Sequence, residues 1–240
     1  MHSELLNRYG IKHLIAGSDY NFRYQTAGDK VKKDIEQIMD VLEVEPDEIY
    51  TGQQTHSANV AYADGENGEA FVFGRTFKDT DGLLTDQRKV GLLIKYADCT
   101  PIVLYDPVNK VLAAVHSGWR GTVQRISEEA IARMEMDFKS KRENLVAFLG
   151  PSIDQANYEV GAEVYEAFRG FKERDTFFQP DGEKYRLSMT DANLTSLIQS
   201  GIKAENIEVD RTSTFSDSRL HSSREEGKDY QLNGLFVMMV

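Results

Sequence analysis

Three side chains in this sequence have the types that bind a divalent transition metal. The only cysteine is Cys99, in the segment YADCTP, and His116 opens the later segment HSGWRG. His56 closes the earlier segment TGQQTH. One thiolate and two imidazoles match the ligand preference of zinc, and three protein ligands leave a fourth position for water or substrate. Such an open site lowers the pKa of bound water to about 7, so this pattern indicates a catalytic metal rather than a structural one.

Each of these residues also has an ordinary structural interpretation. A lone cysteine such as Cys99 between apolar strands is commonly a small buried hydrophobe. His56 and His116 lie among Gly, Ser, Thr and Gln residues, in loop-like segments where functional polar side chains collect. We assign His2 to a flexible terminus, His13 to a strand surface and His221 to a solvated loop.

Arg120 lies beside the second histidine ligand, where the chain turns from a strand into a helix. Gly118 and Gly121 permit a sharp turn, and we expect a helix to begin near Thr122. The amides of a helix N-terminus and a guanidinium group both favour phosphate or carboxylate. This corner is therefore a candidate anion site. Asp98 is a candidate hydrogen-bond partner of the metal ligands or proton carrier beside them.

Composition narrows the class of protein. With 240 residues and 40% hydrophobic content, the chain can bury a substantial core, and we expect one domain over residues 1–240. The net charge of −11 disfavours a nucleic-acid polymer or an anionic membrane as partner, but not a single nucleoside. One cysteine permits no internal disulfide, and neither a signal peptide nor a membrane-spanning run is evident, so a cytoplasmic location is expected.

The pattern of apolar residues predicts strands alternating with helices, which is typical of an α/β fold. The short turn after Asp106 suits an antiparallel pair, so we expect a mixed sheet. The segment 177–182 has the composition of a loop, and 81–85 is a turn that enters a strand. Expected strands are 11–17, 48–56, 59–63, 90–96, 101–105, 111–116, 145–149 and 235–240, the three central runs being adjacent, and expected helices are 29–42, 122–138, 161–171 and 191–199.

Taken in chain order, five segments resemble the YfiH/YlmD family, also called the multicopper polyphenol oxidase or laccase-domain family. The resemblance implies a four-layer α-β-β-α sandwich with mixed sheets and a zinc ion, or copper, held by His56, Cys99 and His116. It also implies phosphorolysis of adenosine, inosine or methylthioadenosine, deamination of adenosine, and purine nucleoside and phosphate as partners. The segments are 53–56 (QQTH), 81–85 (DGLLT), 97–107 (ADCTPIVLYDP), 113–121 (AAVHSGWRG) and 150–153 (GPSI).

Three alternatives remain open. Some relatives in this family are described as peptidoglycan-precursor editing factors, and a metal-free cysteine amidase would use Cys99 as nucleophile and His116 as base. A polyphenol oxidase needs more ligands than five histidines provide. A non-catalytic protein would bind metal or nucleoside without turnover.

The chain also departs from the family pattern: a second cysteine near 211–213 is missing, and Ser223 and Glu225 replace an aromatic residue and an arginine. These departures put substrate preference in doubt, and the sequence leaves the oligomeric state open.

Overall fold

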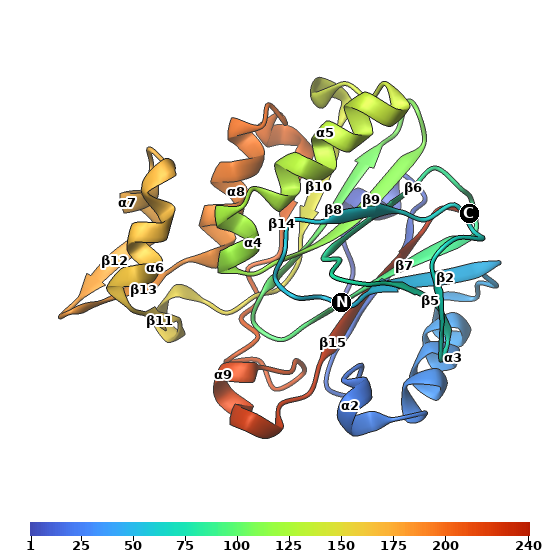
Figure 1. Ribbon diagram of the computed structural model, residues 1–240, viewed down its shortest axis with the longest axis horizontal. Helices are drawn as coiled ribbons and strands as arrows, with labels where there is room; N and C mark the ends of the chain where they lie inside the picture. Colours follow the sequence, from blue (N-terminus) through green and yellow to red (C-terminus); the bar gives the residue numbers. More distant parts are fainter.

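Two six-stranded mixed sheets stacked face to face form the centre of the molecule. The computed structural model describes residues 1–240 (Figure 1). The first sheet has the order β1 (Lys12–Ala16), β15 (Asn233–Met238), β7 (Val90–Tyr96), β2 (Glu48–Gly52), β5 (Gly74–Phe77) and β4 (Glu69–Phe71). The second has the order β14 (Ile207–Val209), β10 (Val146–Leu149), β8 (Thr100–Asp106), β9 (Val111–Ser117), β6 (Gly82–Thr85) and β3 (Val60–Tyr62).

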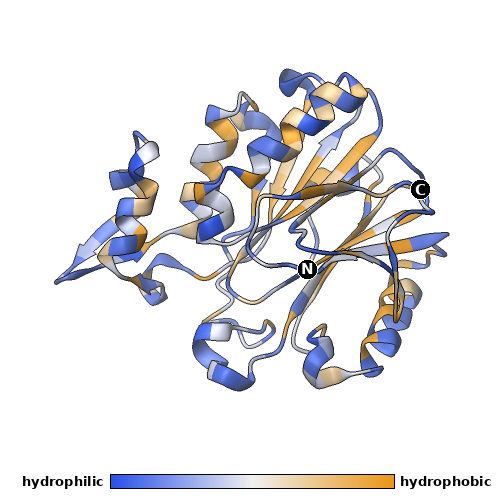
Figure 2. Ribbon diagram, in the orientation of Figure 1, coloured by the Kyte–Doolittle hydropathy of each residue, from blue (hydrophilic) through white to orange (hydrophobic).

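Strand alternation divides the apolar side chains between an inner and two outer layers. In β7, Leu92 and Ile94 face the core between the sheets, whereas Leu93 faces the opposite side. In β9, Leu112 and Ala114 face the same central core. Successive side chains of a strand point to opposite faces, so strands covered on both faces read as continuous apolar runs. Figure 2 shows these runs in orange along the strands of both sheets.

Helices cover both outer faces and complete four layers. On the first sheet lies α3 (Lys30–Leu42), which packs Val31, Ile35 and Ile38 against it. The second sheet is covered by α5 (Ile126–Phe138) and α8 (Met189–Gln199), which share its outer apolar cluster. Figure 1 shows these helices on opposite sides of the pair of sheets. The expected four-layer α-β-β-α sandwich with mixed sheets is therefore confirmed.

A smaller lobe extends from one side of the sandwich (Figure 1). It contains a three-stranded antiparallel sheet and a cluster of phenylalanines that includes Phe168, Phe171 and Phe177. Its elements are β11 (Glu159–Val160), α6 (Ala162–Ala167), α7 (Arg174–Phe177), β12 (Phe178–Asp181) and β13 (Lys184–Leu187). The remaining short helices are α1 (Glu4–Arg8), α2 (Tyr24–Ala27), α4 (Trp119–Val123) and α9 (Ser223–Glu226). None of the helices has both the length and the apolar character needed to cross a bilayer.

Four sequence expectations are corrected by the structure. The three central strands are not neighbours in one sheet: β7 belongs to the first sheet, and β8 and β9 pair in the second. The expected helix 122–138 is two helices, α4 and α5, because Arg125 adopts a left-handed conformation with φ 63° between them. The loop expected at 177–182 is largely the strand β12. His13 and His221 are buried rather than at the surface, with 2% and 5% of their area exposed.

The central core gives a direct test of the layer assignment. Leu92 has no exposed area and packs between the sheets, so Leu92→Ala leaves a cavity that the two stacked sheets cannot close. We expect a loss of about 2–5 kcal/mol in the free energy of unfolding, measured by urea denaturation. The control is Val108→Ala, because Val108 is 64% exposed in the turn between β8 and β9 and its truncation changes stability by less than about 0.5 kcal/mol. Equal effects of the two substitutions would contradict the layer assignment.

Candidate metal centre

The three predicted ligands converge at one edge of the sandwich, and each comes from a different segment of the chain. Cys99 lies in the link in which the chain leaves β7 and enters β8, which is where it crosses from one sheet to the other. His116 is near the end of β9 and pairs with Pro101 of β8. His56 lies in the loop after β2, the parallel neighbour of β7. The sulfur and imidazole donor atoms all lie within 4.8 Å of one another.

The three ligands differ in their access to solvent. His116 is buried, Cys99 is half-buried and His56 is exposed. The rings of the two histidines meet edge to face, with their centroids 5.1 Å apart. Tetrahedral zinc with ligand distances of about 2.0–2.3 Å brings its donor atoms to within about 4 Å of one another, which fits this cluster. The exposed side at His56 leaves a direction from which water or substrate can approach.

The carboxylate of Asp81 accepts hydrogen bonds from both His56 and His116. Asp81 immediately precedes β6, which pairs with β9, so it is the cross-strand neighbour of His116. One carboxylate oxygen accepts from His116 Nδ1 at 2.8 Å and from the backbone amide of His56 at 3.1 Å. The other accepts from the amides of Thr55 and Ser57 and from the Ser57 hydroxyl, at 2.8–2.9 Å. The hydrogen bond at Nδ1 leaves Nε2 of His116 for the metal, which is how a ligating histidine is commonly oriented.

Charge at the centre favours the ionised forms of these side chains. Burial acts to raise the pKa of Asp81, but the hydrogen bond and charge of His116 outweigh it and lower that pKa to about 2. Burial also acts to raise the pKa of Cys99, yet the charges of His116 and His56 lower it to about 6. Burial lowers the pKa of His116, but the Cys99 thiolate and Asp81 together raise it to about 9. In the absence of metal, Cys99 and His116 are therefore a thiolate–imidazolium pair.

Backbone geometry at the site is unusual at two non-glycine residues. His56 has φ 64° and Asp98, next to Cys99, has φ 84°, both in the left-handed region that most side chains avoid. Such conformations persist where the surroundings hold them, and here the hydrogen bonds of Asp81 to the His56 loop do so. Gly118 is required for a different reason: a Cβ there would lie 2.7 Å from Cys99 Sγ and 2.9 Å from His56 Cδ2. The side chains of Cys99 and His56 thus occupy the space that a side chain at position 118 would fill.

The His56 loop is also fastened to the end of β7. The side-chain amide of Gln54 pairs with the backbone of Lys95, donating to its carbonyl at 2.6 Å and accepting from its amide at 2.9 Å. The Lys95 ammonium donates to Thr51 Oγ1 and to the Gly52 carbonyl. Burial lowers the pKa of Lys95 to about 8, against the opposing charge of Asp81. These bonds place His56 at the same sheet edge as Cys99.

Asp98 does not hydrogen-bond to the histidine ligands. Its carboxylate accepts from the hydroxyls of Thr214 and Ser222 and from the backbone amide of Arg224, each at 2.7 Å. The carboxylate that does bind a predicted ligand is that of Asp81, a residue that the sequence pattern places in a turn entering a strand. A role for Asp98 in proton transfer remains a prediction. Its observed contacts tie the Cys99 link to the C-terminal segments of the chain.

Arg120 stands at the exposed side of the centre. It lies in the first turn of α4, and its guanidinium covers the ring of Trp119, 4.2 Å from the ring centroid. No acidic side chain forms an ion pair with it. Because α4 has only five residues, its aligned peptide dipoles contribute little to anion binding. The guanidinium of Arg120, rather than a helix N-terminus, is therefore the candidate anion-binding group here.

Two residues that the sequence analysis did not select as site residues lie near the same centre. Burial and then the charge of Cys99 raise the pKa of Tyr158, and the charges of Arg224 and Arg120 oppose the rise. The guanidinium of Arg224 lies 5.2 Å from the centroid of the Tyr158 ring. Tyr158 follows a single 3₁₀ turn without an obvious motif, and Arg224 lies in a four-residue helix between Ser223 and Glu225, the two departures from the family pattern. Their proximity depends on the tertiary fold.

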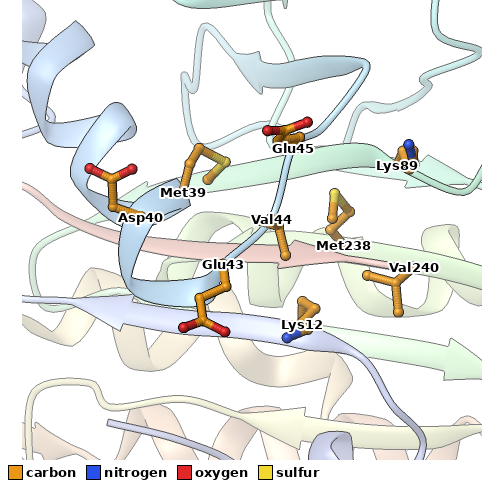
Figure 3. Close-up of a pocket in the computed structure, with 9 residues that line it drawn as sticks. All are labelled: Lys12, Met39, Asp40, Glu43, Val44, Glu45, Lys89, Met238 and Val240. Carbon is orange, nitrogen blue, oxygen red and sulfur yellow. The ribbon is translucent and has the colours of Figure 1, made fainter.

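Two cavities lie away from the metal ligands. One of about 590 Å³ lies at the opposite end of the first sheet, where Lys12, Met39, Lys89 and Met238 line it between α3 and the strand ends (Figure 3). Another of about 370 Å³ is lined by Thr214, His221, Glu225 and further residues of the C-terminal segments. Glu225 thus faces a cavity that contains none of the three ligands.

Comparison with known proteins identifies the family. Residues 11–240 match the family model described as multi-copper polyphenol oxidoreductase laccase. The chain belongs to this family. It is 33% identical over 196 residues to the purine nucleoside phosphorylase of Bacteroides thetaiotaomicron, a match covering 78% of this chain and 71% of that protein. It is 34% identical over 192 residues to the adenosine deaminase RL5 of an unknown prokaryotic organism, covering 75% and 72%.

A solved structure extends the likeness to the fold. The crystal structure of the hypothetical protein YfiH from Bacillus licheniformis superposes with a TM-score of 0.84 at 25% identity, covering 88% of this chain and 82% of that one. The resemblance to the YfiH/YlmD family given by the sequence motifs is therefore confirmed. In this laccase-like family member, His56, Cys99 and His116 form one cluster that could hold a metal ion. A three-copper cluster with a separate electron-entry copper needs many more ligands than this.

The hydrogen bonds of Asp81 predict how its substitution changes the affinity of the centre for a metal ion. In Asp81→Asn, either orientation of the new amide places its NH₂ group against two or more donors that the carboxylate now accepts. We expect at least a tenfold loss in affinity for the bound transition metal, because a partner that orients a metal-ligating histidine typically contributes about 10–100-fold. The measurement is metal content after dialysis against a graded chelator. The control is Asp47→Asn, an exposed carboxylate before β2 that has no side-chain partner, which should leave metal binding unchanged.

Proposed function

We propose that this chain is a zinc-dependent purine nucleoside enzyme that catalyses phosphorolysis of adenosine, inosine or methylthioadenosine and deamination of adenosine. The observation that carries the proposal is the cluster of His116, Cys99 and His56, which runs from buried to exposed, together with the guanidinium of Arg120, which has no ion pair. A metal held by this cluster would be open on its exposed side, and Arg120 would bind an anion there. The names of the relatives, a purine nucleoside phosphorylase and an adenosine deaminase, support the substrate class.

The donor set suits zinc. One thiolate and two imidazoles match a borderline-soft ion, and hard cations such as Mg²⁺ prefer oxygen ligands. Copper is the alternative that the family's description suggests. When bound, zinc supplies a Lewis acid that polarises a substrate group or acidifies water. The chain's own residues fix its position: Asp81 orients His116, and Gly118 leaves space for Cys99 and His56.

In phosphorolysis, the chain must hold a phosphate dianion and a nucleoside together. Arg120 binds the phosphate through charge-assisted hydrogen bonds and directs one of its oxygens at the ribose C1′. The C1′–O bond forms, the C1′–N bond to the purine breaks, and the bonding electrons leave with the base, which takes up a proton. In deamination, water adds at the purine C6 and ammonia leaves. Asp98 is the candidate carrier for the proton in either reaction.

A second candidate function follows from the arrangement of Asp81, His116 and Cys99. A carboxylate orients an imidazole, and the imidazole faces a thiolate whose pKa is about 6. This is the geometry of a cysteine nucleophile with its base, as an amidase that edits peptidoglycan precursors would need. Metal occupancy separates the two proposals, because a sulfur bound to zinc is not free to attack a carbonyl carbon.

Metal analysis tests the zinc assignment directly. We expect the purified protein to contain close to one zinc ion per chain by mass spectrometry. Cys99→Ser, His56→Ala and His116→Ala should each lose most of that metal, because two remaining ligands hold zinc weakly. Copper in place of zinc would correct the identity of the ion. Full occupancy in all three variants would contradict the site, and a metal-free active protein would favour the cysteine amidase.

A turnover screen tests the reaction. Purified, metal-analysed protein is incubated with adenosine, inosine or methylthioadenosine, with and without phosphate, and release of the purine base is measured. We expect base release to require phosphate. Arg120→Ala should raise the KM for phosphate by about 10-fold or more while changing the KM for the nucleoside little, because it removes a charge-assisted contact to the anion. Equal effects on both KM values would contradict the role of Arg120.

A further inference from the structure

Arg224 is connected to the metal centre through its backbone. Its amide donates to Asp98 Oδ2 at 2.7 Å, and Asp98 directly precedes the ligand Cys99. Ser222, the N-cap of α9, donates its hydroxyl to the other oxygen of the same carboxylate. These two bonds fix the start of α9 against the Cys99 link. The backbone position of Arg224 is therefore defined by the same turn that presents the thiolate.

The guanidinium of Arg224 is held but not neutralised. It donates to the carbonyl of Glu159 at 3.1 and 3.2 Å and lies over the Tyr158 ring. It forms no ion pair with any carboxylate, although the chain has 39 acidic residues. A guanidinium has five N–H donors, so several remain free to bind an oxyanion. The contacts with Glu159 and Tyr158 reduce the entropy that binding would otherwise cost.

Tyr158 connects this guanidinium to the rest of the centre. The guanidinium of Arg224 lies 5.2 Å from the centroid of its ring, and the charges of Cys99, Arg224 and Arg120 all act on the pKa of its phenol. Figure 1 shows the segment that leads into β11 passing between α4, which carries Arg120, and α9, which carries Arg224. Tyr158 and Trp119 pack on the same apolar cluster of the small lobe. Arg120 over Trp119 and Arg224 beside Tyr158 are thus both carried by aromatic rings that pack on this one cluster.

We propose that Arg224 and Tyr158 complete a phosphate subsite together with Arg120, Arg224 supplying the second guanidinium and Tyr158 a phenolic hydrogen-bond donor. This inference rests on the proposed function, since it assigns the residues that bind its phosphate. Two guanidinium groups from separate elements can each contact different oxygens of a dianion, and charge-assisted contacts of this kind are about twice as strong as neutral ones. Because α4 is too short to act through its dipole, side chains must provide the positive charge.

The same chemistry would bind inorganic phosphate or the phosphoryl group of a nucleotide. We assign the subsite to inorganic phosphate, because the proposed phosphorolysis takes inorganic phosphate as its second substrate. Binding of inorganic phosphate and of adenosine monophosphate is therefore measured separately.

The experiment measures binding of inorganic phosphate to the full-length, zinc-loaded protein by isothermal titration calorimetry. Arg224→Gln should weaken phosphate binding by about 10- to 100-fold, the usual effect of losing a charged hydrogen bond, and Arg224→Lys should recover part of it. Tyr158→Phe retains the ring and should weaken binding by about 3- to 10-fold. The control is Arg169→Gln, an exposed arginine without an ion pair, which should leave phosphate binding unchanged. Zinc content should be unchanged in every variant.

Each outcome decides a separate question. Unchanged phosphate binding in Arg224→Gln, or absence of phosphate binding in the wild type, overturns the inference. Loss of zinc from Arg224→Gln overturns it as well, because the residue would then be structural. Weaker binding of adenosine monophosphate without weaker binding of phosphate reassigns the subsite to a nucleotide and overturns the assignment made here. If phosphate binds through Arg224 but no purine nucleoside is cleaved, the subsite stands and the proposed function fails.

Discussion

A single buried carboxylate sets the geometry of this centre. Asp81 accepts five hydrogen bonds, one from His116 Nδ1 and four from the loop that carries His56. A fully buried carboxylate is costly unless its lone pairs are satisfied, and here every donor belongs to a ligand or to a ligand's neighbours. The free-energy cost of burying the Asp81 carboxylate is therefore lower when His116 and the His56 loop donate their hydrogen bonds to it. Stability of this corner and geometry of the metal site depend on the same contacts.

The position of the site follows from the way in which the two sheets are connected. A strand of the first sheet, β7, continues through Cys99 into β8 of the second, so the sulfur lies where the chain passes from one layer to the other. His116 arrives from the second sheet, and His56 from the loop that follows a strand of the first. Ligands drawn from both sheets can meet only at the edge where the central apolar core ends. The stacked core thus holds the ligands in register without contributing any atom to the metal.

The sequence indicated which three residues come together but not the residues that support them. Cys99, His56 and His116 suggested a metal cluster by their types, by the polar surroundings of the histidines and by the family resemblance, and their donor atoms lie within 4.8 Å of one another. Asp81 was interpreted as a turn residue, since an Asp-Gly pair before a strand has that ordinary meaning and no local pattern shows which histidine lies across the sheet. His221 shows the opposite case: a polar segment suggested solvent, yet the ring is buried with partners at both nitrogens, Glu226 and the Tyr20 carbonyl. Periodicity also could not assign a strand buried on both faces to one of two stacked sheets.

Asp81, His116 and Cys99 are compatible with either a metal enzyme or a cysteine hydrolase. The two differ in whether Nε2 of His116 carries a proton or binds a metal. Asp81 fixes the proton on Nδ1 in both cases, so Nε2 faces Cys99. Without metal, the high pKa of His116 keeps a second proton on that nitrogen, and the pair is a thiolate beside an imidazolium. His116 Nε2 and Cys99 Sγ would hold a divalent ion only after Nε2 has lost this proton. Metal binding therefore requires release of the proton from an already ionised pair, and the thiolate that would serve as a nucleophile is the group that makes metal binding favourable.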